Sequence, residues 1–195
     1  MFDDASRTVL SVTISGCVLS SLHYEGLSND GDVIGFLFGD EKFSTQNPPS
    51  ELPSDEWSQS SGIPSFANSV VVDIKGFIVC PHLSPCARES LSGDNYEAHV
   101  RRLVRSHGLY TPKSTKSAEY HPIVGTFACR QNTSVGPSLA DTRLQSVLSR
   151  VLLENGRKCN LVFASFALEI DPLSCTQTVN YKFLQFLSEP WYVDG

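Results

Sequence analysis

Short stretches rich in valine, isoleucine, threonine and aromatic residues recur along the chain and predict β-strands. Residues 33–38 are continuously apolar, which is typical of a strand buried on both faces. The last stretch, residues 177–183, alternates between apolar and polar positions, so we expect a strand with one face in water. Four further strands are predicted, over residues 8–14, 70–80, 123–129 and 161–168.

Three segments have apolar residues at helical spacing, and each starts at a residue that can cap a helix. Ser15 precedes the first segment, and Ser138 opens the third. Asp94 opens the second, where it forms a capping box with Glu97. The expected helices cover residues 15–26, 94–107 and 138–155, and the positions expected to face the core are Val18, Leu19, Leu22, Tyr96, Val100, Leu103, Val104, His107, Ala140, Leu144, Val147, Leu148 and Val151.

The predicted order is strand, helix, strand, strand, helix, strand, helix, strand, strand. It indicates an α/β fold in which helices pack on a mixed sheet. Residues 41–69 interrupt this order, because they contain four prolines and many serines and have little periodicity. We expect them to form an exposed, mobile loop inserted between two strands. The 195 residues suit a single domain with this one insertion.

Composition and charge exclude several classes of protein. Apolar residues make up 41% of the chain and charged residues 18%, which argues against global disorder. The net charge of −6 is unlike the basic footprint of a nucleic-acid-binding protein. The sequence has neither an apolar run of spanning length nor a basic secretory signal, so we expect a soluble protein of the nucleus and/or cytoplasm.

The basic residues cluster at one place, where Arg101, Arg102 and Arg105 follow the polar side of the second predicted helix. We expect a solvated helix face there, and a site for an acidic partner is the alternative. The six cysteines are scattered and form no CxxC pair, so we expect reduced thiols rather than a zinc ribbon or a disulfide framework. A thiol enzyme that uses Cys80 or Cys86 with His82 is a further alternative, although a strand end followed by a turn explains these residues more simply.

Four residues at the end of the strand predicted over 123–129 and at the start of the third helix have a distinctive spacing. Ala128 and Arg130 lie two positions apart, Ser138 follows after seven residues, and Asp141 after two more. This layout resembles the JAMM zinc-isopeptidase motif, His-x-His, seven residues, Ser, two residues, Asp, with both histidines replaced. Ser138 and Asp141 alone also fit an ordinary helix cap, so the whole frame rather than this pair makes the resemblance.

The resemblance to the JAMM motif implies that this chain has lost the zinc-binding histidines. In JAMM enzymes two histidines and an aspartate hold zinc and leave its fourth position for water, which the metal activates. A glutamate is the general base, and the serine stabilises the oxyanion. Here Ala128 offers no donor atom, and Arg130 places a fixed positive charge where the dication would lie. We therefore expect a pseudo-enzyme with no metal, no cofactor and no catalytic residue.

Other stretches resemble the MPN domain family and, within it, the catalytically inactive Abraxas branch. Asp32 falls where active members have the catalytic glutamate. The resemblance covers about residues 8–187, and it departs from the family pattern at Thr126, where a tryptophan is usual, and in the insertion at 41–69. The stretches that resemble family motifs are residues 14–22 (ISGCVLSSL), 32–40 (DVIGFLFGD), 124–127 (VGTF) and 180–183 (NYKF).

For this chain the family implies an MPN/JAMM-like fold with a cytidine-deaminase-like three-layer arrangement. It also implies a scaffold that pairs with an active JAMM deubiquitinase specific for ubiquitin chains linked through lysine sixty-three, in the BRISC complex or a nuclear DNA-damage complex. The partner would form a heterodimer with it, or a dimer of heterodimers, and neither nucleic acid nor membrane would be bound. By analogy, the first and third helices are the expected interface.

Two points stay open at the level of the sequence. Family members continue into a coiled coil, whereas this chain stops at Gly195, so we expect either a fragment or assembly through the domain face alone. The alternative function is that of an inactive MPN subunit of the proteasome lid, the signalosome or the translation-initiation complex, which would also be a scaffold but with different partners.

Overall fold

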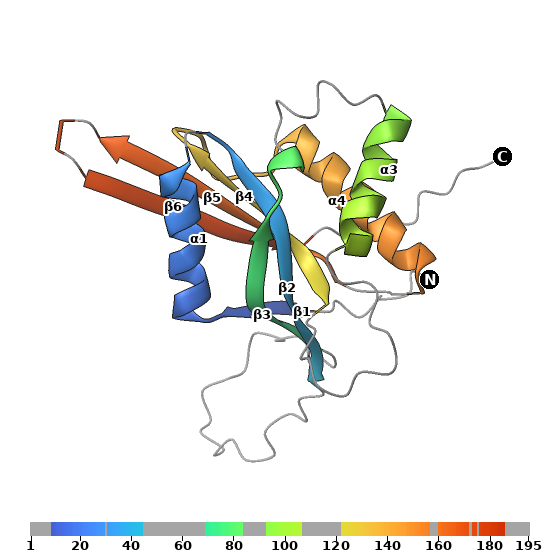
Figure 1. Ribbon diagram of the computed structural model, residues 1–195. Helices are drawn as coiled ribbons and strands as arrows, with labels where there is room; N and C mark the ends of the chain where they lie inside the picture. The colour runs from blue at the N-terminus through green and yellow to red at the C-terminus, as the bar shows by residue number, and fades with distance from the viewer. Residues whose placement is uncertain are drawn as a thin grey trace, which may run out of the picture.

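A computed structural model describes residues 9–29, 31–44, 69–83, 93–106, 122–156, 160–171, 173–174 and 176–185. These residues form a mixed α/β fold built on one six-stranded sheet with the strand order β1-β3-β2-β4-β5-β6 (Figure 1). β1 pairs with β3 and β4 with β5 in parallel, and the other neighbours are antiparallel. The strands are β1 (Val9–Ile14), β2 (Val33–Ser44), β3 (Ser69–Val79), β4 (Ile123–Gln131), β5 (Val162–Asp171) and β6 (Thr176–Gln185).

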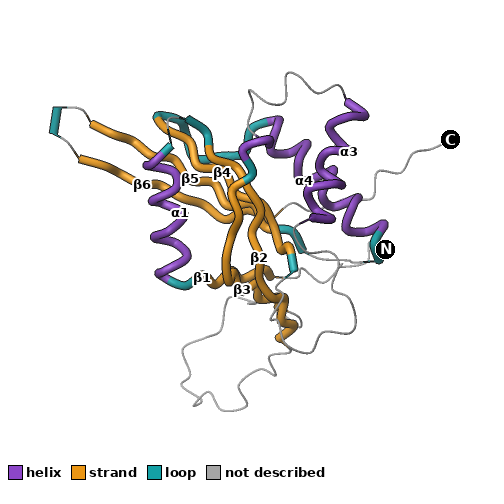
Figure 2. Tube along the Cα trace, in the orientation of Figure 1, coloured by secondary structure: helices purple, strands orange, loops and turns teal. Residues whose placement is uncertain are grey.

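Helices cover both faces of this sheet and give the fold three layers. On one face lies α1 (Gly16–Ser28), whose Leu22 is buried in an apolar cluster with residues of β2 to β5. On the other face lie α3 (Gly93–Val104) and α4 (Leu139–Glu154), which bury their apolar sides against β2, β4 and β5. Figure 2 shows this separation of α1 from the pair α3 and α4. A short 3-10 helix, Pro81–Leu83, follows β3.

Across the described residues, the order of strands and helices predicted from the sequence is confirmed. Ser15 and Ser138 cap α1 and α4 as expected, since the side chain of each accepts a hydrogen bond from the third residue beyond it. The expected core positions of α4 are buried, apart from the half-buried Ala140. The expected His107 and the helix end at Gly108 lie outside the described residues.

The predicted insertion was placed wrongly at both ends. β2 runs six residues past Phe38, to Ser44, because residues 39–44 continue the antiparallel ladder with β3 after a bulge. Ser69 already pairs with Ser44 and belongs to β3. Residues 45–68 lie outside the described part of the chain.

The second helix differs from the prediction in two respects. α3 begins at Gly93, one residue before the expected start, and the Asp94 side chain of the predicted capping box lies outside what the structure describes. Arg101 does not lie on a purely solvated face, because it pairs with Glu97 on its own helix at 2.7 Å and with Glu154 of α4 at 2.8 Å. The arginine thus joins the two helices, whereas Arg102 and Arg105 are exposed as expected.

Candidate functional site

The Ser138–Asp141 pair forms the N-terminus of α4. The backbone N–H of Asp141 donates to Oγ of Ser138 at 3.2 Å, and the backbone N–H of Ser138 donates to Oδ2 of Asp141 at 2.7 Å. Both halves of a capping box are therefore present. The hydroxyl of Ser138 also donates to the same Oδ2 at 2.7 Å. The cap fixes the Asp141 carboxylate, which is only 1% exposed, at the helix end nearest β4.

Arg130 bonds to this carboxylate from β4. Its Nη2 donates to both oxygens of Asp141, at 2.8 Å to Oδ1 and 2.6 Å to Oδ2, and it lies 3.4 Å from Oγ of Ser138. Its Nε donates to Oδ2 of Asp32 at 3.2 Å. The side chain of Arg130 is 11% exposed, and that of Asp32 is 31% exposed. One guanidinium thus lies between two carboxylates that are far apart in the sequence.

The strand register explains why Asp32 reaches this place. β2 and β4 are antiparallel, and Val33 at the start of β2 pairs with Cys129, so Asp32 lies beside Arg130. Arg130 and Ala128 share the α4 side of β4, because alternate strand residues point to the same face. Four of the five residues singled out from the sequence therefore converge at the end of β4, and Ala128 lies one step deeper along the strand.

Ala128 is fully buried in the apolar cluster beneath α3 and α4. Its direct neighbours across the sheet are Ile34 on β2 and Ser165 on β5. A methyl group at this point extends the core up to the guanidinium and offers no electron pair to a metal. In the described ranges, no three His, Cys, Asp or Glu side chains are grouped so that they could hold a metal ion.

The charges in this site explain how a buried aspartate is tolerated. A carboxylate taken out of water is costly unless it is paired and hydrogen-bonded, and Asp141 has both a charged partner and the two donors of Ser138. Arg130 in turn has a second carboxylate, Asp32, on its more exposed side. The site therefore holds its own permanent cation in a place lined by acidic groups.

A buried polar pair next to this site was missed by the sequence analysis. Nε2 of Gln145, one turn after Asp141, donates to Oγ1 of Thr126 at 2.6 Å and to the carbonyl oxygen of Val162 at 3.3 Å. Both side chains are buried. The available signal was the two-residue spacing from Thr126 to Ala128 and Arg130, which puts a threonine on the α4 face of β4. Gln145 thereby ties α4 to the middle of the sheet.

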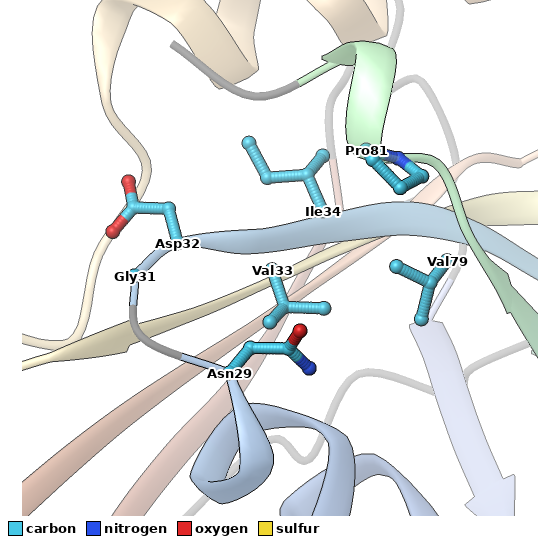
Figure 3. Close-up of a pocket in the computed structure, with 7 residues that line it drawn as sticks. All are labelled: Asn29, Gly31, Asp32, Val33, Ile34, Val79 and Pro81. Carbon is cyan, nitrogen blue, oxygen red and sulfur yellow. The ribbon is translucent and has the colours of Figure 1, made fainter. Parts of the chain in front are cut away.

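A shallow pocket of about 210 Å³ lies beside Asp32, where α1 ends and β2 begins (Figure 3). Figure 3 shows Asp32 pointing away from Val79 and Pro81, and Ile34 and Val33 leaving β2 in opposite directions. The lining side chains that Figure 3 labels therefore do not converge on one point. Its other lining residues are Asn29 and Gly31.

The cysteine alternative has little support in the described residues. Cys80 is buried, and burial raises the pKa of its thiol to about 11, so the reactive thiolate is scarce at neutral pH. His82 lies in the short 3-10 helix, but its side chain and all of Cys86 are outside what the structure describes.

Comparison of the sequence with models of known protein families and with curated proteins found no match. Among the described helices, none has both the length and the apolar content needed to cross a membrane.

Proposed function

We propose that this chain is a non-catalytic scaffold with an MPN-like domain of the Abraxas type. Its partner would be a JAMM zinc deubiquitinase that cleaves ubiquitin chains linked through lysine sixty-three. The support comes from the sequence motifs together with the convergence of the positions that the motif alignment picks out. The fold in hand, a mixed sheet between α1 and the pair α3 and α4, is compatible with the expected three layers.

One observation carries the proposal: Arg130 lies among Asp32, Ser138 and Asp141. These are the residues at the positions of the general base, the oxyanion serine and the ligand aspartate of the JAMM motif. A guanidinium has no lone pair to bind a metal, and its positive charge repels a dication. The same charge stabilises the two carboxylates that a zinc ion would otherwise stabilise. In this proposal the spacing of the motif residues is retained, and the guanidinium of Arg130 takes the place of the metal ion.

A scaffold of this kind would act through its surface. α1 exposes Tyr24, and α4 exposes Leu139 and Leu153 at its two ends. Tyrosine is among the residue types that most often anchor protein interfaces, and exposed leucines beside such an anchor add apolar contact area. Binding energy gained on these helices could hold the loops of a catalytic partner in their reactive geometry, which is how an inactive subunit raises activity.

The test is affinity purification of the tagged chain from its native cells, with identification of the co-purifying chains by mass spectrometry. The proposal expects a JAMM deubiquitinase in near-equal amount. Subunits of the proteasome lid, the signalosome or the translation-initiation complex would support the alternative function instead. Recovery of no MPN-domain partner would contradict both.

The same purification can be made specific for the helix surfaces. Leu153→Asp and Tyr24→Asp each place a charge on an exposed position of α4 or α1 and should reduce recovery of the partner without unfolding the chain. Leu173→Asp changes an exposed leucine in the turn between β5 and β6, outside both helices, so it is the matched control and should recover the partner at the normal level.

A further inference from the structure

β6 is the feature of the fold that the proposed function leaves unused. Among the described strands it has a single neighbour, β5, so one of its two edges has unpaired backbone N–H and C=O groups. The ladder with β5 runs without a shift over ten residue pairs, from Thr176 to Gln185. In Figure 1 the β5–β6 hairpin extends past α1, away from α3 and α4.

Within its own residues, which the structure describes from Thr176 to Gln185, β6 lacks the devices that usually protect an exposed strand. Natural edge strands are kept apart by prolines, bulges, short length or several charged residues. β6 has no proline and no bulge, is ten residues long, and has one charged residue, Lys182. β1 at the opposite edge has six residues, so it offers a shorter ladder.

The face of β6 beside α1 is apolar and only partly covered. Tyr181 is 49% exposed, although its ring lies 5.9 Å from that of Phe166 and 6.0 Å from that of Phe183. His23 of α1 lies 6.3 Å from Tyr181. The aromatic side chains of Phe166, Phe183 and Tyr181 therefore extend across this face of the sheet as far as its open edge at β6.

We propose that β6 pairs with β6 of a second copy of this chain, antiparallel and centred on Tyr181, to form a continuous sheet across a two-fold axis. This inference does not depend on the proposed function.

The sequence of β6 is complementary to itself in that register. On the α1 face Tyr181 lies opposite its own symmetry mate, and Val179 lies opposite Phe183 of the other copy. Aromatic pairs and aromatic pairs with β-branched residues are among the most favourable cross-strand contacts. On the other face Lys182 lies opposite Asn180, so the single positive charge of the strand does not meet itself. In this register, each residue whose backbone N–H and C=O groups point away from β5 lies opposite another such residue. These groups can therefore form hydrogen bonds between the two copies.

Asn180 and Lys182 make the register testable, because both are exposed and neither packs in the core. Asn180→Glu would create two Glu–Lys pairs across the axis, and Asn180→Lys would create two Lys–Lys pairs. Opposite charges directly across an antiparallel pair stabilise it, and like charges destabilise it. We expect the dimer dissociation constant to fall roughly fivefold in the first variant and to rise roughly fivefold in the second. Asn180→Lys combined with Lys182→Glu should restore tight association.

The measurement is sedimentation equilibrium of the full chain and the three variants over a wide concentration range, with circular dichroism to confirm equal folding. A dimer whose dissociation constant follows this order supports the proposal. A wild-type chain that stays monomeric at the highest concentration would overturn it. A dimer that is indifferent to all three variants would also overturn it, because association would then use another surface.

Discussion

Nη2 of Arg130 lies 2.6 Å from Oδ2 of Asp141, the third residue of α4, whose carboxylate completes the capping box with Ser138. This ion pair joins the end of β4 to the beginning of α4. In a metal site of the JAMM layout, a zinc ion would make the same connection between strand and helix. Here the guanidinium of Arg130 supplies a permanent positive charge between strand and helix.

The first prediction follows from the burial of this pair. Arg130→Ala should lower the free energy of unfolding by about 3 kcal/mol, because it leaves the Asp141 carboxylate buried without a cation. Urea denaturation measures the change. Asp141→Asn added to Arg130→Ala should recover part of the loss, since no buried charge then remains.

Arg102→Ala is the matched control, because Arg102 is an exposed arginine on α3. It should change the free energy of unfolding by no more than about 0.5 kcal/mol. If Arg130→Ala costs no more than this control, the ion pair does not hold β4 to α4.

The second prediction concerns Gly125, which lies on β4 ahead of the site. A Cβ at this position would overlap the carbonyl oxygen of Val162 on β5. Gly125→Ala should therefore push the two strands apart and destabilise the fold by about 1–3 kcal/mol. Gly76→Ala on β3 is the control, because a Cβ there meets nothing within 4 Å. Equal thermal stability of the two variants would contradict the close packing of β4 on β5.

The third prediction concerns the thiols. Burial raises the pKa of Cys80 to about 11 and that of Cys129 to about 12, whereas Cys17 is exposed. At pH 8, iodoacetamide should modify Cys17 well before Cys80 or Cys129, and it should reach the last two only when urea unfolds the chain. Peptide mapping by mass spectrometry reads out the order. Modification of Cys129 in the native protein as fast as Cys17 would contradict its burial.

The same thiols should make the fold sensitive to alkali. Their pKa values are higher in the folded chain than the ordinary value of 9.0, so the stabilisation is complete below pH 9. It should be lost as the pH rises towards 11 and 12, because the unfolded chain then loses protons first. Cys129→Ala should flatten this alkaline decline in the free energy of unfolding. An unchanged slope would assign the decline to other groups.

The sequence predicted the order of the elements because strand-forming runs and capping residues are local signals. Ser15 and Ser138 were identified as caps from their own positions, and the structure confirms both. The end of β2 was missed because Asp40, Glu41 and Lys42 look like loop residues, and only the pairing with β3 makes them a strand. Long-range pairing of this kind leaves no mark in the local pattern.

The site was predictable as a set of positions but not as a set of contacts. Spacing placed Ala128 and Arg130 on one face of a strand. Whether the guanidinium would turn inward to Asp141 or outward to water depends on the partners that α4 and the start of β2 supply. Arg101 illustrates the same limit, because its bond to Glu154 requires α3 and α4 to lie side by side.

The central claim is that the site keeps the frame of a zinc isopeptidase and that Arg130 has taken the place of the metal. The most direct measurement is zinc binding by the wild-type chain and by Ala128→His/Arg130→His, using calorimetry and elemental analysis, with circular dichroism to verify folding. The account predicts no zinc in the wild type and one zinc per chain in the folded double variant, lost again when Asp141→Asn is added. Zinc bound by the wild type, or a folded double variant that binds none, would contradict it.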